Sequence, residues 1–234
     1  MPTLDLKSIV ERLEKLHGKP KAPNFGGLLE MILWENVAYL ADDEKRELAF
    51  NALRERVGVT PQEILSASPG ALRAVTETAG ILPRNQVQKL CRIAEIARDE
   101  FDSDLDQILR RPIEQARTAL KKFPGIGNPG AEKILLFCRA QPILALDSNG
   151  LRVLLRLGFG TEQKNYAASY RSAQESAQQG LKADCRWLIR AYQLLRKHGQ
   201  ETCRRNRPNC GVCPLVRCCQ YYQEADSRPN ALKR

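Results

Sequence analysis

The sequence predicts an all-α protein. Apolar residues recur at helical spacing along most of the 234 residues, and the alternation typical of strands is scarce. A helix-start signal stands at Thr60-Pro61-Gln62-Glu63, with threonine as the cap, proline at the first helical position and glutamate at the third. A chain of this length can bury a sizeable core, as one large domain or as two smaller lobes.

Other segments extend this pattern along the chain. Helices are expected over residues 1–20, from Ser68 to Gly80, from Asn85 to Phe101, and from Asp104 to Phe123 with a break at Pro112. The first of these is amphipathic and carries acidic residues, so it does not resemble a signal peptide. The tail after Glu224 is expected to fray.

Composition narrows the kinds of partner. The formal net charge of +10 favours a polyanion, nucleic acid ahead of an anionic membrane. No apolar run reaches the roughly 18 residues that a membrane span needs. A cytoplasmic protein, associated with the nucleoid in a prokaryote, is therefore expected, in a reducing compartment that suits metal binding by cysteine. Single cysteines in apolar helical contexts are expected to be buried, namely Cys91, Cys138 and Cys185.

Four cysteines near the C-terminus are the most informative feature. They have the spacing C-x6-C-x2-C-x5-C and are Cys203, Cys210, Cys213 and Cys219. Their loop has almost no apolar side chains, so burial alone cannot order it. The spacing favours a [4Fe–4S] cluster; structural zinc, which more often uses two Cys-x2-Cys pairs, is the second interpretation, and disulfides are the third. Cys218 competes as the fourth ligand, and Cys219 is preferred.

Arginines surround these cysteines, namely Arg204, Arg205, Arg207 and Arg217. The loop is then either a rigid platform that presents cations to a partner or an ordinary solvated basic loop. Its residues alone favour neither interpretation.

A second informative stretch is LKKFPGIGNPGA, residues 120–131. A helix is expected to end at Phe123 and a new one to start with Asn128 as its cap, after a tight Pro-Gly-x-Gly turn. The glycines allow positive φ and close approach of another backbone, and the first N–H groups of the second helix can bind one phosphate. The alternative is an ordinary antiparallel helix connection. The candidate binding residues here are Lys121, Lys122, Gly125, Gly127, Asn128 and Gly130.

Asp147 ends the apolar run 143–146 and precedes a helix with an apolar inner face. On this local pattern alone, its carboxylate is expected to cap that helix. A catalytic role for the same carboxylate depends on the segments around it.

Three segments together resemble the helix–hairpin–helix DNA glycosylases of the endonuclease III and MutY type. They are FPGIGNPGAEKIL, LALDSNGLRVLLRLGF and HGQETCRRNRPNCGVCPLVRCC, in the family's order and spacing. The resemblance implies two helical lobes that clasp DNA, with the target nucleotide flipped into the cleft between them. The first lobe implied is a six-helix barrel-like lobe over residues 23–135, with the hairpin at about 115–137. The second lobe joins residues 1–22 with residues 136–223 and contains the cluster loop at 203–219. A flexible tail is implied at 224–234.

The resemblance also implies the chemistry, which is that of a base-excision-repair hydrolase acting on N-glycosyl bonds. Asp147 matches the family's catalytic aspartate, which stabilises oxocarbenium-like charge on the sugar and can orient a water. Glu30 matches the acid that protonates the departing base in adenine-removing members, and a solvated helix edge is its alternative. The implied cofactor is a [4Fe–4S] cluster. The implied partner is double-stranded DNA with a damaged or mismatched base, which is easiest to flip, bound by a monomer.

Further positions gain a role from the resemblance. Trp34 is expected to stack on the flipped base, with a place in the core as its alternative. Asn36 is expected to fill the space that the flipped base leaves, and Leu82 to wedge into the duplex. The hairpin residues would hold the DNA backbone, and Arg204 and Arg205 would contact phosphates.

Two departures from the family pattern concern the reaction. Strand-cleaving members carry a lysine in the hairpin helix, and Pro129 stands in its place, so we expect a monofunctional glycosylase with weak or absent lyase activity. Lys133, one turn later, keeps a bifunctional lyase as an alternative, and a non-catalytic DNA-lesion-binding module is another. After the aspartate, Ser148-Asn149-Gly150 is smaller than the usual family sequence, and the glycine is expected to leave room beside the site.

Overall fold

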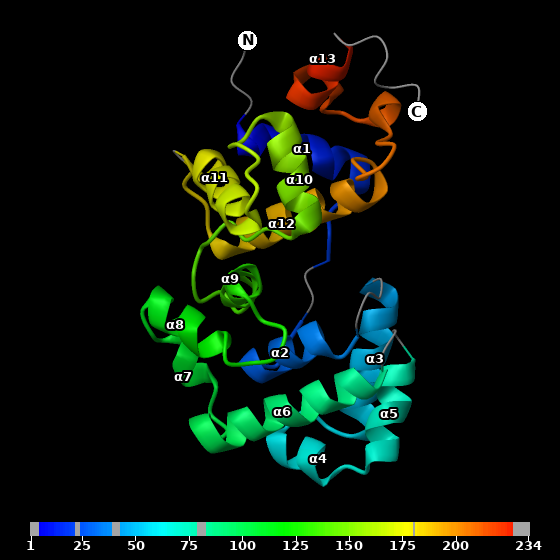
Figure 1. Cartoon of the computed structure of the whole chain (residues 1–234), viewed down its shortest axis with the longest axis vertical. Helices are drawn as coiled ribbons and strands as arrows, with labels where there is room; N and C mark the ends of the chain where they lie inside the picture. The colour runs from blue at the N-terminus through cyan, green and yellow to red at the C-terminus, as the bar shows by residue number, and fades with distance from the viewer. Residues whose placement is uncertain (1–4, 22–23, 39–42, 79–82, 180, 227–234) are drawn as a thin grey trace. The chain divides into compact units, whose positions relative to one another are not determined.

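The computed structural model describes residues 5–21, 24–38, 43–78, 83–179 and 181–226 (Figure 1). These residues form helices joined by turns and loops, and no strand occurs among them. The all-α prediction is confirmed. No helix in this described part of the chain is long and apolar enough to cross a membrane.

The chain divides into two compact units. One joins Met1–Pro23 with Pro142–Arg234, and the other is Asn24–Gln141. The first unit is therefore discontinuous in sequence, because α1 (Leu6–His17) packs against α12 (Cys185–Glu201) from the far end of the chain.

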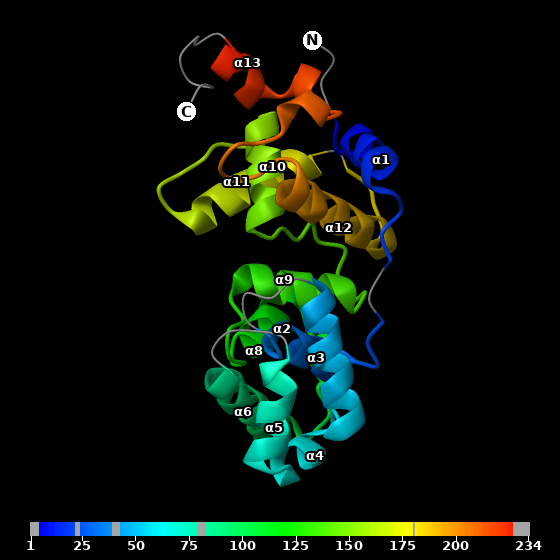
Figure 2. The ribbon, with the colours of Figure 1, turned by 90° about the vertical axis from the view of Figure 1, so that its right-hand side faces the viewer.

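The second unit is built around one long helix. Its described helices are α2 (Leu28–Asn36), α3 (Asp43–Arg56), α4 (Pro61–Ser66), α5 (Pro69–Glu77), α6 (Pro83–Phe101), α7 (Asp106–Leu109), α8 (Ile113–Leu120) and α9 (Asn128–Phe137). The 19-residue α6 packs against α2, α4 and α5 (Figures 1 and 2). Its Leu90, Ile93 and Ala97 are fully buried, as its apolar spacing requires.

Local signals set the helix starts in this unit. The N–H of Glu63 donates to Oγ1 of Thr60, and Oε2 of Glu63 accepts from the N–H of Thr60 at 2.9 Å, which confirms the predicted capping box of α4. The predicted break at Pro112 is also confirmed, because that residue is the N-cap of α8.

The predicted helix ends are less accurate. The helix expected to reach Phe123 ends at Leu120, because the chain enters turns at the two lysines before the proline. α5 ends at Glu77, before the predicted Gly80, which lies outside the described residues.

The first unit has an apolar core under a loop-rich end. Besides α1 and α12, its described elements are α10 (Ser148–Leu157), α11 (Tyr166–Gln178), the 3-10 turns η1 (Cys210–Val212) and η2 (Val216–Cys218), and α13 (Gln220–Asp226). α10 packs against α11, α12 and α13, and Ile9, Leu154 and Leu195 are fully buried between the helices. Most of the tail expected to fray lies outside the described residues.

Candidate functional site

Asp147 stands at the start of α10 as its N-cap, which confirms the capping expected from its local pattern. Its Oδ1 accepts hydrogen bonds from the backbone N–H groups of Asn149, at 3.1 Å, and Gly150, at 2.7 Å. Its Oδ2 accepts from the Asn149 side chain at 3.0 Å and lies 3.4 Å from Nε of Arg196. These hydrogen bonds fix the direction of the carboxylate. Because 22% of the side chain is exposed, the carboxylate is still reachable from solvent.

Gly150 lies against Asp147 and Leu195. A Cβ added to this glycine would lie 3.4 Å from Oδ1 of Asp147 and from Cβ of Leu195, an ordinary contact distance, so the room beside the glycine is limited to a small group such as a methyl. Burial raises the pKa of Tyr166, and the charge of Asp147 raises it further, so this tyrosine is a neutral hydroxyl group near the carboxylate.

A chain of hydrogen bonds runs from Asp147 to the cysteine loop. Arg152 donates from Nη2 to Oδ1 of Asn149 at 2.9 Å, and from Nε to the carbonyl of Cys203 at 3.0 Å. The same Nη2 donates to the carbonyl of Gly199 at 2.7 Å. Because Asn149 in turn donates to Asp147, the carboxylate and the first cysteine belong to one polar network.

The four predicted cysteine ligands face one cavity of about 20 Å³. The cysteines in its lining are Cys203, Cys210, Cys213 and Cys219. Cys218 is not in the lining, because its Sγ donates to the carbonyl of Leu215 at 3.2 Å and lies 3.7 Å from Nη1 of Arg12. The geometry therefore favours Cys219 over Cys218 as the fourth ligand.

Four cysteine thiols around one cavity are a ligand set that suits either a [4Fe–4S] cluster or a structural zinc ion. Within the described residues, no three Cys, His, Asp or Glu side chains are grouped closely enough to hold a single metal ion. Burial raises the pKa of Cys210 and Cys219, and raises that of Cys213 to about 11, so a cationic partner is needed to hold these groups as thiolates.

Two side chains that the sequence analysis did not single out touch these cysteines. Nη1 of Arg156 lies 3.3 Å from Sγ of Cys203 and donates to the carbonyl of Arg204 at 2.8 Å. Nε2 of His198 lies 3.4 Å from Sγ of Cys213. Burial lowers the pKa of His198 to about 4, so this imidazole is neutral at pH 7.

The helix–turn–helix of the second unit consists of α8, a tight turn and α9. Gly125 in the turn has a φ of 71°. This is the left-handed conformation that the glycines of the turn were expected to allow. The predicted cap Asn128 is wrong: the cap is Gly127, because the first helical bond of α9 runs from the N–H of Ala131 to the Gly127 carbonyl. No side chain caps this end, which leaves it suited to an anion.

The two lysines before the turn differ in their contacts. Lys121 is exposed, whereas Nζ of Lys122 pairs with Oε2 of Glu100 at 2.5 Å. Both side chains are more than a third exposed, so this pair is a weak one that an incoming phosphate can replace.

Pro129 lies in the first turn of α9, and Lys133 follows one turn later. Nζ of Lys133 lies 2.6 Å from Oε1 of Glu35, and the two side chains are only 18% and 22% exposed. An amine held in such an ion pair is a poor nucleophile, because the pair favours its protonated form.

Glu30 lies in the first turn of α2 and is 16% exposed. Its Oε2 accepts from the N–H of Gly26 at 2.8 Å and pairs with Nη2 of Arg54 at 2.7 Å. The guanidinium of Arg54 lies over the ring of Phe50, 4.8 Å from its centre. Glu30 therefore has the charged partner that a mostly buried carboxylate needs.

Trp34 belongs to an aromatic cluster beside this ion pair. Its ring packs edge-to-face on Phe25, at 5.5 Å between centres, and on Phe50, at 5.4 Å. Trp34 is half-buried, so the placement suits both a core residue and a stacking surface.

The remaining predicted residues lie as follows. Asn36 is 3% exposed and donates from Nδ2 to the carbonyl of Ile32 at 3.1 Å. Its Oδ1 would lie 3.1 Å from a Cβ on Gly125, so this side chain lies against the hairpin turn. Leu82 lies outside the described residues. The side chains of Arg204 and Arg205 are exposed on the cysteine loop.

Five basic residues of the site escaped the sequence analysis: Arg54, Arg152, Arg156, Arg196 and His198. A signal existed for two of them, because Arg152 and Arg156 recur four residues apart, on one face of the helix that follows Asp147. Arg54 had none, since its contact with Glu30 spans 24 residues of sequence.

Comparisons with known proteins agree on one group of enzymes. No family model matches the chain. It is 28% identical to endonuclease III of Sulfolobus acidocaldarius, over 85% of this chain and 82% of that protein, and 23% identical to endonuclease III of Escherichia coli K12, over 93% and 96%.

Solved structures agree on the fold. A trapped endonuclease III–DNA covalent intermediate has a TM-score of 0.72 at 18% identity, covering 96% of this chain and 100% of that one. A thermostable thymine-DNA glycosylase has a TM-score of 0.73 at 15% identity, covering 94% and 97%.

Proposed function

Because the chain belongs to the helix–hairpin–helix DNA glycosylase superfamily, we propose that it is a base-excision-repair enzyme. It hydrolyses the N-glycosidic bond of a damaged or mismatched base in double-stranded DNA, without a covalent intermediate. The observation that carries the proposal is the carboxylate of Asp147, which is held by Asn149 and Gly150 and remains partly exposed at the start of α10.

Asp147 acts on the sugar. As the base leaves, positive charge builds on the sugar ring and negative charge on the base. A carboxylate beside C1′ stabilises the positive charge and directs a water to it. The two backbone N–H groups and the Asn149 amide already hold this carboxylate, so little reorganisation is needed during the reaction.

Glu30 is the second carboxylate of the mechanism. Its ion pair with Arg54 supports a role in orienting a water over a role as proton donor, because an ion-paired carboxylate accepts hydrogen bonds. The aromatic cluster that includes Trp34 and Phe25 lies beside it and offers an apolar surface to a base.

DNA is held through its backbone. The uncapped start of α9 and the glycines of the turn bind one phosphate, and Lys121 and Lys122 add charge beside it. Arg204 and Arg205 on the cysteine loop contact further phosphates. Relatives named endonuclease III, and solved complexes of endonuclease III with DNA, support this partner.

The reaction stops at hydrolysis. Pro129 has no amine and cannot form a Schiff base with the sugar. The candidate substitute, Lys133, is held by Glu35 and is a poor nucleophile in that state. These two observations favour a monofunctional glycosylase over the alternative lyase.

The four cysteines that line the small cavity, namely Cys203, Cys210, Cys213 and Cys219, would hold a [4Fe–4S] cluster. When bound, it cross-links the loop through iron–sulfur bonds. The loop thereby becomes a fixed platform for Arg204 and Arg205, and Arg156 and His198 hold its sulfurs from inside the unit.

The proposal is tested with end-labelled duplexes that bear uracil, mismatched thymine, hypoxanthine, oxidised guanine, adenine opposite oxidised guanine, or an abasic site. We expect breaks at one of the modified or mismatched bases only after hot alkali. Asp147→Asn should slow base release by about 10²–10³-fold, since it removes the charge that stabilises the sugar cation.

A matched control is Asp184→Asn, because Asp184 caps α12 in the same unit with a 2.8 Å bond to the N–H of Trp187. Asparagine also caps helices well, so both variants are expected to fold. Full activity in Asp147→Asn, or an equal loss in Asp184→Asn, would contradict the role of Asp147.

A further inference from the structure

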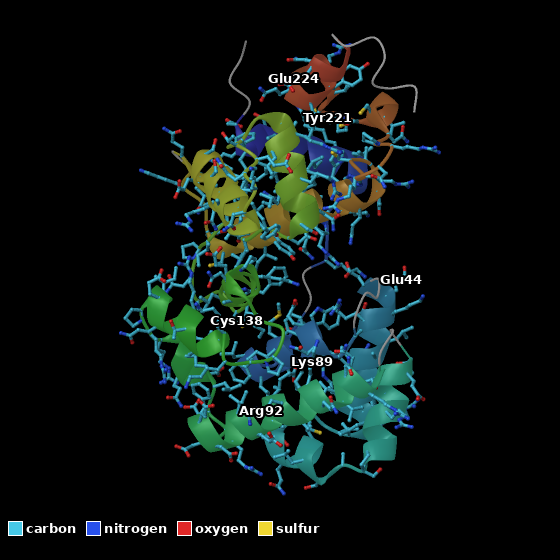
Figure 3. All side chains as sticks on the ribbon, viewed as in Figure 1. Glu44, Lys89, Arg92, Cys138, Tyr221 and Glu224 are labelled. Atoms are coloured by element: carbon cyan, nitrogen blue, oxygen red, sulfur yellow. The ribbon has the colours of Figure 1, made fainter. Side chains whose placement is uncertain are left out.

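A groove of about 810 Å³ runs along α10 in the first unit. It begins beside Ser148, the residue after Asp147, and reaches Tyr221 and Glu224 on α13, both labelled in Figure 3. Residues from the segment 160–166 form the other wall. Apart from Arg205, none of the groups assigned above to DNA contact or excision lies in this groove.

The wall opposite α10 is held by contacts that need no ligand. The N–H of Thr161 donates to Oγ of Ser172 at 2.9 Å, and the N–H of Gln163 donates to Oγ of Ser169 at 2.7 Å. Gly160 has a φ of 74°, and a Cβ there would lie 2.5 Å from the backbone of α11. These contacts hold the loop against α11, so the protein's own packing fixes this wall of the groove without a ligand.

Positive charge dominates the lining. Its charged residues are Arg152, Arg156, Lys164 and Arg205 against Glu162 and Glu224. Four cations and two carboxylates leave a net charge of +2 in the groove. Such a surface attracts a phosphate backbone.

Two tyrosines also line the groove, Tyr166 and Tyr221, and they are 48% and 38% exposed. The guanidinium of Arg156 lies over the ring of Tyr221, 4.4 Å from its centre, which keeps that ring in place. Exposed aromatic rings among cations are the combination on which unpaired bases stack while their phosphates are neutralised.

We propose that this groove binds a short stretch of single-stranded DNA. Its phosphates lie at Lys164 and Arg205, and its bases stack on Tyr166 and Tyr221. The volume is in the range of pockets for small organic ligands, which suits a few nucleotides of one strand. The inference goes beyond base excision and holds whether or not the chain excises a base.

The first test measures binding of the cluster-loaded protein to a fluorescent oligothymidylate by anisotropy. This strand carries no lesion, so excision does not enter the result. Lys164→Glu should raise the Kd about tenfold at low salt and reduce the salt slope by about 0.7, because one phosphate contact is lost. Tyr166→Ala should raise the Kd at least about fivefold through lost stacking.

Lys7→Glu is the matched control, because Lys7 is exposed on α1 of the same unit and the change in net charge is identical. Its Kd should stay within about twofold of the wild type, since long-range effects on exposed charges are screened. An unchanged Kd in Lys164→Glu, or an equal loss in Lys7→Glu, would overturn the proposal.

A second measurement does not depend on variants. A strand carrying 5-iodouracil is photo-cross-linked to the wild-type protein, and the joined peptide is identified. We expect peptides that contain Tyr166 or Tyr221, whereas cross-links confined to residues 113–137 would overturn the groove. Excision on lesion duplexes is scored separately, so strand binding without excision would refute the proposed function and leave this inference standing.

Discussion

Asp147 combines the helix cap seen in the structure with the catalytic role that we propose for it. Its Oδ1 receives both backbone N–H groups at the start of α10, whereas Oδ2 faces the side chains of Asn149 and Arg196. A carboxylate fixed in this way keeps one orientation, which is what stabilisation of a developing cation requires. The capping role followed from the local sequence, and the proposed catalytic role needs the surroundings as well.

The choice between two adjacent cysteines is a prediction at the same scale. Cys219→Ser should lower the iron content of the purified protein and abolish most of its cluster absorbance, because Cys219 lines the cavity. Cys218→Ser should leave both unchanged, because its sulfur points to Leu215 and Arg12. The reverse pattern of iron content would show that Cys218 is the ligand.

At the scale of elements, the hairpin turn depends on one glycine. Gly125→Ala should destabilise the protein by about 1–2 kcal/mol, because alanine is strained at positive φ. Its Cβ would also press on Oδ1 of Asn36 at 3.1 Å. The shifted turn should weaken duplex binding, measured by anisotropy beside the free energy of unfolding in urea.

Gly70→Ala is the control for this prediction. Gly70 is exposed in α5, and a Cβ there would meet only Oγ of Ser68, at 3.9 Å. Alanine is a better helix former than glycine, so the control should gain up to about 1 kcal/mol with unchanged DNA affinity. Equal stability of Gly125→Ala and the wild type would mean that the turn does not need its glycine.

Elements were predictable from the sequence where their signals are local. The capping box of α4 and the break at Pro112 depend on residues within one turn of each other, and both are confirmed. The cap of α9 was misassigned, because Gly127 and Asn128 are both good caps and only the first backbone bond decides between them. The ends of α5 and α8 lie about three residues before the predicted ends, because the backbone hydrogen bonds that end a helix leave no clear local signal in the sequence.

The candidate site was predictable only in part, because its contacts are long-range. The cysteine spacing and the aspartate stand out in the sequence. The partners of those residues come from elsewhere in the chain: Arg152 reaches Cys203 across 51 residues, and Arg54 reaches Glu30 across 24. Only folding brings these partners together, so no local sequence pattern predicts the contacts.

At the scale of the whole molecule, the cysteine loop should depend on its metal. Of residues 203–219 only Leu215 and Cys219 are buried, which is too little apolar surface to order the loop. Removal of iron by a chelator under oxidising conditions should expose the loop to trypsin. We expect cleavage after Arg204, Arg205 or Arg217 to become at least about tenfold faster.

The second unit is an internal control for this experiment, because it contains no proposed ligand. Tryptic sites within Asn24–Gln141 should be cut at the same rate with and without iron. Equal protection of the loop in both states would contradict the view that metal binding orders it.

The central claim, hydrolysis by Asp147 without a covalent intermediate, is tested most directly by borohydride trapping. The protein is mixed with a duplex that carries an abasic site, and borohydride reduces any Schiff base to a stable protein–DNA adduct. Because Pro129 has no amine and Lys133 is held by Glu35, the account predicts no adduct, and no difference between the wild type and Lys133→Ala. An adduct that forms with the wild type and disappears in Lys133→Ala would contradict the account and make the protein a lyase.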